Sequence, residues 1–490
     1  MVHVVTDIWY PIWFPGDEVS MAAVCLSWLF STAYLYRMLR KAAQSNGYER
    51  ATSPGIGGIF SPYLKLALLI MPHANIAEIV AKFQAVSTFD DVVACWLSNR
   101  AKMEKFTALF AFDDIGTELP IEATRANYDG EKFYLRSIFS KSKIYFLNDD
   151  IWFSIRGNGK IKIPVNSVLV LDTQFGNYAT KFVASPEFRE TPLGQSVNNL
   201  LTYIYQNQIV FDFSFYLFEN FANYRAGKRK EIESQLSALK TLGDADRDDF
   251  LSKGNIRLPY SQEHLKKEVA DLVALYQTRA QRLEFAKLEL LQSNIANLLL
   301  KAILLKNEDC QPNEKVGKLI DFLHNDLSVI LQRELIICAK WLLGQNVSLF
   351  DPVNVGPGFT QAPKNVHGMA WDLMLLRHVE KYCSQTGRGE CTIAYFSSFD
   401  RKMIEASDLW KSKGCIYPPS EKLGRYFMLS EEDYFSWLSS VVGIEKTSAI
   451  FNDQAWKHRD ENRPPPEEVF AVRRALEYMV VKALKPKVKQ

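Results

Sequence analysis

The stretch Ser167-Val168-Leu169-Val170-Leu171-Asp172 is the part of this sequence that decides the fold, because it is an apolar run that ends in an acid. A strand buried on both faces is apolar at consecutive positions, as in the interior of a parallel sheet. An acid that follows such a strand lies at the carboxyl edge of the sheet, where open α/β folds bind ligands. The stretch therefore predicts a parallel strand with Asp172 at a candidate site.

The segment after this strand alternates between helix and strand patterns. Apolar residues at helical spacing predict a helix at 193–206, and a short apolar run predicts a strand at 209–213. A second helix is expected at 214–224, and it carries Glu219. This order of elements predicts an α/β unit.

From residue 228 to about residue 344 the sequence has helical periodicity throughout. Ser261 is placed to begin one long helix, and Pro312 separates it from another. Apolar residues at helical spacing would pack two or three antiparallel helices together: Val269, Leu272, Val273, Leu275, Tyr276, Leu283, Phe285, Leu288, Leu290 and Leu291. We interpret this region as a helical insertion that is either scaffold or an arm that grips RNA or forms a dimer.

The α/β pattern resumes after a turn-rich passage at 351–364. A helix is expected at 365–382, where it contains Asp372, and a strand at 391–396 leads into Ser398 and Asp400. A second acid therefore follows a predicted buried strand.

A chain of 490 residues is too long for one ordinary core. The expected fold class is α/β, with an α+β N-terminal accessory domain at 1–155 and a helical C-terminal region at 416–490. The core is expected in two parts, 156–227 and 351–415, which the helical insertion at 228–350 separates.

The order of the acids resembles that of the PIN-domain nucleases, over residues 161–224 and 365–410. An acid after the first strand, an acid on an early helix, an acid on a later helix and a final acid in a Ser-x-Asp turn correspond to Asp172, Glu219, Asp372 and Asp400. The resemblance implies a PIN-like, Rossmann-type parallel sheet. It also implies that Ser398 orients Asp400.

What the resemblance implies chemically is a metal-dependent endoribonuclease, in which those four carboxylates are the catalytic residues and ligate Mg²⁺ or Mn²⁺. Hard divalent ions prefer oxygen ligands, polarise a phosphodiester and activate water. Arg225, Lys228 and Arg229 would bind substrate phosphates. RNA is expected rather than DNA only because PIN-like proteins usually cut RNA. The same resemblance implies a role as a toxin or antiviral-defence effector.

Each of the four acids also has a purely structural interpretation. Asp172 and Asp400 each precede a predicted helix and could cap it. Glu219 could form a structural salt bridge among aromatic residues, and Asp372 could be a buried hydrogen-bond anchor. Asp212 is the substitute for Glu219 if the helix aligns differently.

The composition indicates the cell compartment and argues against disulfide bonds and zinc sites. The formal net charge is only +2, so any nucleic-acid surface must be local. The seven cysteines show no CxxC spacing and the histidines no HExxH pattern, which argues against disulfides and zinc. A cytoplasmic protein is expected.

The uncharged segment 19–36 is just long enough to span a membrane, but its hydroxyl-bearing residues favour a buried helix. A buried helix is therefore the favoured interpretation, and a membrane span at 19–36 stays open as the alternative. A homo-oligomer and an inhibitory or activating protein partner both stay open. The alternative to a nuclease is a non-catalytic helical interaction protein on a degenerate α/β core.

Overall fold

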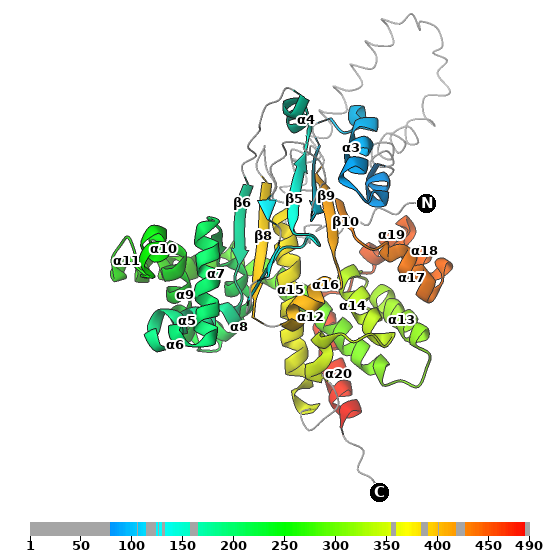
Figure 1. Ribbon diagram of the computed structural model, residues 1–490. Helices are drawn as coiled ribbons and strands as arrows, with labels where there is room; N and C mark the ends of the chain where they lie inside the picture. The colour runs from blue at the N-terminus through cyan, green and yellow to red at the C-terminus, as the bar shows by residue number, and fades with distance from the viewer. Residues whose placement is uncertain are drawn as a thin grey trace, which may run out of the picture. The chain divides into compact units, whose positions relative to one another are not determined.

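Two five-stranded sheets organise the part of the chain that the computed structural model describes (Figure 1). The described residues are 79–104, 106–113, 124–125, 127–129, 133–156, 165–353, 359–383, 391–399, 401–417 and 427–485. One sheet, here called the mixed sheet, has the strand order β3-β4-β8-β6-β7. The other, here called the antiparallel sheet, has the order β10-β9-β1-β5-β2.

The centre of the mixed sheet is parallel, as the sequence predicts. β6 (Val165–Val170) pairs in parallel with β7 (Val210–Asp212) on one side and with β8 (Cys391–Ser398) on the other. β4 (Tyr134–Arg136) and β3 (Asn127–Asp129) add an antiparallel edge beyond β8. The expected strands at 167–171, 209–213 and 391–396 are all confirmed.

Helices cover both faces of the mixed sheet, which explains the continuous apolar run in β6. Leu169 and Ile393 belong to a core formed with α5 (Thr173–Ala184), α7 (Pro192–Gln206) and α9 (Arg229–Asp244). Val170 and Phe396 belong to a second core, formed with α12 (Arg279–Lys306), α14 (Gln332–Leu342) and α15 (Ala362–Cys383). Successive residues of a strand point to opposite faces, so each face needs its own apolar set.

β6 lies where the order of the parallel strands reverses. The chain leaves β6 for β7 on one side and later returns to β8 on the other. In open α/β sheets this reversal opens a crevice at the carboxyl ends of the two strands. The crevice predicted by topology is therefore beside Asp172, two residues past the end of β6.

The predicted insertion is helical but is not a separate arm. α11 (Gln262–Tyr276) begins after the cap Ser261, and α13 (Pro312–Asp321) begins at the expected proline. However, α9 packs on α5, and α12 packs on α15 and α20 (Pro466–Leu484). These helices fill both cores, so deleting residues 228–350 would remove much of the buried apolar surface.

Two apolar positions assigned to helix packing are instead exposed. Leu275 is 52% and Leu283 is 50% exposed. α11 packs through Leu265, Val269 and Val273, which follow one another at intervals of four residues. Leu275 comes two residues after Val273 and so projects from another side of the helix.

The antiparallel sheet joins strands from the N-terminal part of the described chain to strands from its C-terminal part. β1 (Thr107–Phe112) pairs with β5 (Lys143–Leu147) on one side and with β9 (Ser412–Tyr417) on the other. β2 (Thr124–Arg125) and β10 (Phe427–Ser430) form its edges. In both sheets, strands before residue 155 thus pair with strands after residue 390. The two sides of the boundary expected at residue 155 therefore share both sheets.

The other helices surround these sheets. The region expected to be helical at 416–490 contains the end of β9 and all of β10 before its helices begin. The helices not yet named are α3 (Phe89–Ser98), α4 (Asp149–Arg156), α6 (Pro186–Glu190), α8 (Ser214–Arg225), α10 (Arg247–Lys253), α16 (Arg401–Asp408), α17 (Tyr434–Val442), α18 (Ile444–Phe451) and α19 (Asp453–Glu461). Short helical turns are η1 (Arg100–Lys102), η2 (Phe322–Asp326), η3 (Ser348–Val353) and η4 (Phe359–Gln361).

The segment 19–36, considered above as a membrane span, lies outside the described residues. Within the described residues one helical stretch, 283–306, is long and apolar enough to cross a membrane. It belongs to α12, and 72% of its most apolar window is buried in the protein. Its apolar character is therefore accounted for by the core.

α5 and α8 approach each other closely at Gly176. A methyl group at this position would lie 2.8 Å from Cε2 of Tyr216, a fully buried residue of α8. The Tyr216 hydroxyl donates to Gln235 Oε1 at 2.5 Å, and Gln235 Nε2 donates to Asn177 Oδ1 at 2.7 Å. The ring is therefore held in place, and the close approach fixes α8 against α5.

We predict that Gly176→Ala lowers the free energy of unfolding by about 1–3 kcal/mol, because the added methyl overlaps a fixed ring. Gly368→Ala is the matched control, since Gly368 is also inside a helix but a methyl there meets nothing within 4 Å. That control should gain up to about 1 kcal/mol from helix propensity. Denaturant unfolding measures both, and equal effects in the two variants would contradict the close packing.

Candidate functional site

Asp172 follows β6 and caps α5. Its backbone is extended (φ −109°, ψ 176°), and Oδ1 accepts a hydrogen bond from the Phe175 amide at 2.7 Å. Aspartate is among the preferred residues for this position because its oxygen pairs with an amide that the helix leaves free. The capping role considered as an alternative for Asp172 is thus present in the structure.

Glu219 reaches the same helix end from α8. Its Oε2 accepts a hydrogen bond from the Thr173 amide at 3.0 Å. Among the described residues Glu219 has no ion pair with a basic side chain, so the structural salt bridge proposed as its alternative role is not formed there. Two carboxylates therefore meet at the first turn of α5.

Burial makes the negative charges of this pair costly. Burial, followed by the repulsion of Glu219, raises the pKa of Asp172 to about 7 from its ordinary value of 3.8. Burial also raises the pKa of Glu219, although its hydrogen bonds with Thr173 oppose the shift. The free amides and dipole of α5 favour the charged forms but do not compensate fully. Near neutral pH the pair thus tends to hold a proton, or a cation in its place.

Asn220 supports the contact between the two helices. Its side-chain amide donates to Thr173 Oγ1 at 2.6 Å and to the Tyr216 carbonyl at 3.0 Å. Asn220 is 4% exposed and adjoins Glu219 on α8. It therefore holds the start of α5 in register with Glu219.

A second polar cluster lies at the end of the neighbouring strand, β7. Asp212 Oδ1 and Oδ2 accept hydrogen bonds from the Ser214 amide at 3.1 Å and its hydroxyl at 2.5 Å. His378 Nε2 of α15 lies 3.0 Å from Ser214 Oγ and 3.5 Å from Asp212 Oδ2. Burial opposes the charged form of Asp212, but its partners, His378 first, prevail and lower its pKa.

The sequence indicated only part of this cluster. The sequence offers Asp212 as a substitute for Glu219, whereas no motif includes His378. One signal for this cluster is present in the sequence: Asp212 lies at the end of a predicted strand, and Ser214 comes two positions later. Such a pair makes the end of the strand polar, so it needs a hydrogen-bond partner from another element. The cluster links β7, α8 and α15 beside the Asp172–Glu219 pair.

Asp372 does not join this pair. It is exposed on α15, so its interpretation as a buried anchor is wrong. Among the described residues no three acidic, histidine or cysteine side chains gather as a metal-binding group. The structure therefore brings together Asp172 and Glu219 without a third described ligand.

The last proposed ligand, Asp400, falls outside the described residues. Ser398, its expected supporting residue, is 3% exposed and ends β8. β8 is the parallel neighbour of β6, with Phe396 opposite Val170. Ser398 therefore ends a strand that is hydrogen-bonded to β6.

Basic residues are exposed where α8 gives way to α9. The Arg225 guanidinium lies 4.5 Å from the centre of the Phe221 ring, and Arg229 pairs with Glu233 at 2.8 Å. Lys228 lies between them and is also exposed. All three are accessible to an anion, and they follow Glu219 by six to ten residues.

The class that fold and site define is a mixed α/β protein with acids at the carboxyl edge of its parallel strands. No family model matches the chain, and neither the curated proteins nor the solved structures include a match. The inference of function therefore starts from the geometry of the Asp172–Glu219 pair.

We predict that Asp172→Asn stabilises the protein as pH rises. The raised pKa means that the folded wild type binds this proton more tightly than the unfolded chain, so it loses stability between about pH 4 and pH 7. Asparagine keeps the cap and has no charge to bury. The gain over wild type should be near zero at pH 4 and reach up to about 4 kcal/mol at pH 8.

Two controls separate charge from capping in this experiment. Asp172→Ala also removes the charge but loses the cap, so it should be about 1 kcal/mol less stable than Asp172→Asn at every pH. Asp246→Asn is the second control, because it changes an exposed cap of α10, in which Asp246 accepts from the Asp249 amide at 3.0 Å, and so removes no buried charge. Denaturant unfolding from pH 4 to pH 8 gives these values. A pH-independent effect of Asp172→Asn would contradict the buried repulsion.

Proposed function

We propose that this chain is a metal-dependent nuclease that hydrolyses RNA, with Mg²⁺ or Mn²⁺ held by Asp172 and Glu219. The observation that carries the proposal is the meeting of these two partly buried carboxylates where the strand order of the mixed sheet reverses. Ligands of open α/β sheets bind at such positions.

A hard divalent cation fits this pair. Carboxylate oxygens are the ligands that Mg²⁺ and Mn²⁺ prefer. The raised pKa of Asp172, due to burial and then to Glu219, means that a positive partner would stabilise both charges. Because the cation competes with the proton, its affinity should rise as the pH rises through about 7.

The residues of the chain have separate roles in this proposal. The Thr173 and Phe175 amides orient one oxygen of each carboxylate. Asp400, oriented by Ser398, would add a ligand from the end of β8. When bound, the metal ion would polarise the phosphodiester and activate the attacking water. Arg225, Lys228 and Arg229 would bind neighbouring phosphates of the RNA strand.

Asp372, unlike Asp172, Glu219 and Asp400, is not a metal ligand in this proposal. It is exposed on α15, so we do not assign it to the set of metal ligands. A toxin or defence role, and cleavage within RNA strands, follow from the PIN resemblance and form part of the same proposal.

The competing function is a non-catalytic interaction protein, and one observation favours it. Both carboxylates already accept a hydrogen bond from the start of α5, as capping alone requires. A scaffold of this kind would bind no metal at the pair. Metal binding therefore separates the two functions.

We predict that Asp172→Asn and Glu219→Gln each abolish Mn²⁺-dependent RNA cleavage and weaken Mn²⁺ binding at least about tenfold, because each removes a charged ligand while keeping its shape. Asp400→Asn should also lose activity by orders of magnitude. Asp246→Asn, the exposed cap, is the control that keeps wild-type activity. Calorimetry with Mn²⁺ and a gel assay on single-stranded RNA measure both effects.

The outcomes of this experiment distinguish the candidates. A wild-type protein that binds no Mn²⁺ and cuts no RNA or DNA would support the scaffold. Full cleavage by the folded Asp172→Asn and Glu219→Gln variants would remove the proposed site. Cleavage of DNA alone would keep the metal site and change the substrate.

A further inference from the structure

The outer side of α20 exposes two large apolar side chains. Tyr478 is 71% and Met479 is 50% exposed. Among the large apolar residues that are exposed in the described part of the chain, these are the only two that are adjacent in the sequence. Single exposed apolar residues are common on a soluble protein, whereas contiguous ones are typical of an interaction surface. The outer side of α20 is therefore a candidate contact with another molecule.

The inner side of α20 is fixed to the core, where the helix packs on α12 (Figure 1). The side-chain amide of Asn297 donates to the Val469 carbonyl at 3.1 Å, and Arg473 Nη1 donates to Gln292 Oε1 at 2.9 Å. The buried residues recur at helical spacing: Val469, Leu476, Val480 and Leu484. The helix is thus held in place, and its opposite side is left at the surface.

Five exposed residues form one stripe along this surface. They follow one another at intervals of three or four residues, which is the spacing of side chains on one face of a helix. The stripe, here called the outer stripe, consists of Glu468, Ala471, Ala475, Met479 and Lys482. Tyr478 borders it. The outer stripe therefore begins with an acid and small side chains and ends with a long apolar side chain and a base.

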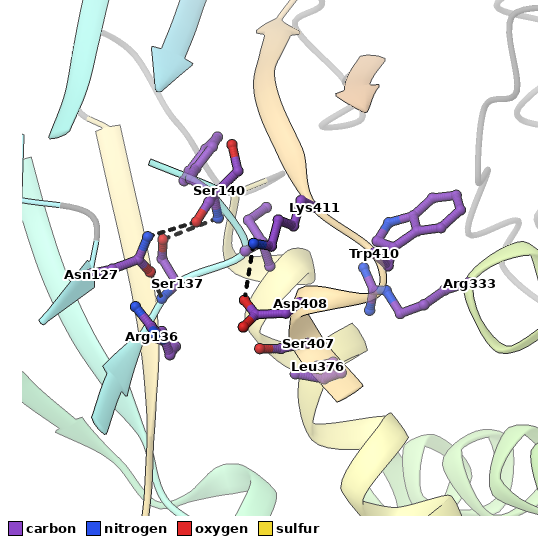
Figure 2. Close-up of a pocket in the computed structure, with 12 residues that line it drawn as sticks. Asn127, Arg136, Ser137, Ser140, Arg333, Leu376, Ser407, Asp408, Trp410 and Lys411 are labelled. Carbon is purple, nitrogen blue, oxygen red and sulfur yellow. Dashed lines mark hydrogen bonds and ion pairs between the residues drawn. The ribbon is translucent and has the colours of Figure 1, made fainter. Parts of the chain in front are cut away.

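The charges of the outer stripe differ from those of the polar cavity beside the loop after β4. In that cavity Lys411 is already paired, with its Nζ 3.5 Å from Asp408 Oδ1 (Figure 2). On α20, in contrast, Glu468 and Lys482 form no ion pair within the described residues, and both are exposed. Their charges are therefore available to groups of a second molecule.

The outer stripe is complementary to a second copy of itself. Glu468 and Lys482 each lie seven residues from Ala475, and residues 471 and 479 each lie four residues from it. Two helices that cross antiparallel about a two-fold axis at Ala475 place residues at equal distances opposite each other. Glu468 of one copy then faces Lys482 of the other. In the same way Met479 packs over the small side chain of Ala471.

We propose that the outer stripe of α20 is the interface of a homodimer of this chain. A symmetric dimer uses the same surface of both copies, so each contact occurs twice. The helix dipole favours an acid at the start of α20 and a base at its end, but it does not require them to lie on one face at equal distances from Ala475. Because one helix of each copy makes the contact, the interface is small, and we expect a dissociation constant in the micromolar range.

The test is sedimentation equilibrium of the full chain at concentrations up to about 100 µM, which covers micromolar dissociation. Ala475→Glu and Ala475→Lys should each weaken dimerisation at least about tenfold, because each places two like charges at the axis. An equimolar mixture of the two variants should associate at least about tenfold more tightly than either variant alone, because opposite charges then meet.

Ala274→Glu is the matched control. Ala274 is also an exposed alanine inside a helix, but it lies on α11 and not on the outer stripe. This variant should keep the dissociation constant of the dimer within about twofold of wild type, because a screened charge away from the interface has little effect. Circular dichroism checks that every variant is folded.

Each result of this experiment decides the proposal. A dimeric wild type, two weakened variants and recovery in their mixture support it. A wild type that is monomeric at about 100 µM would overturn it. Equal effects of Ala274→Glu and Ala475→Glu would also overturn it.

A monomeric wild type that binds single-stranded RNA, and loses this binding with Tyr478→Ala, would overturn the dimer and assign the face to RNA. Should the Ala475 variants fail to fold, Lys482→Gln decides. It removes the partner of Glu468, so it should weaken the dimer severalfold, and an unchanged dissociation constant would contradict the pairing.

Discussion

The structure depends on the contact between the first turn of α5 and the side of α8. α5 follows β6, the central parallel strand, and its free amides donate hydrogen bonds to two carboxylates: the Phe175 amide to Asp172, the cap of α5, and the Thr173 amide to Glu219 of α8. The absence of a side chain at Gly176 allows this approach. The same contact that closes the core therefore brings two acids together at the carboxyl edge of the sheet.

This arrangement lowers the stability of the folded protein at neutral pH. A helix start is stabilised by one acid, typically by less than about 1 kcal/mol when exposed. Here a second acid is added and both are partly buried, so the pKa of Asp172 rises to about 7. Capping alone does not require that repulsion, and the proposed cation would relieve it. Residues that lower stability in this way are common at functional sites.

The parallel strands and their helices could be predicted from sequence because burial on both faces leaves a direct pattern. The apolar run 168–171 and the spacing in 193–206 record contacts made within each element. The position of α9 and α12 could not be predicted this way. Their periodicity shows which side of each helix is buried but not which elements cover that side. In the sequence, α9 and α12 therefore resemble an insertion, although they belong to the core.

The site was predictable only where an acid ends a strand. Asp172 comes two residues after β6, and the order of acids, which resembles that of a nuclease family, indicates Glu219. His378 has no local signal, because its partner Ser214 is more than a hundred residues away in the sequence. Asp372 has the expected position in sequence, but it is exposed on the helix surface.

The central claim is that Asp172 and Glu219 share a divalent cation. The most direct measurement is a crystal structure of the full chain soaked in Mn²⁺ at pH 8, with anomalous diffraction to locate manganese. We expect one anomalous peak at about 2.2 Å from an oxygen of each carboxylate. A structure with saturating Mn²⁺, no peak at this pair and both carboxylates bound only to the Thr173 and Phe175 amides would contradict the account.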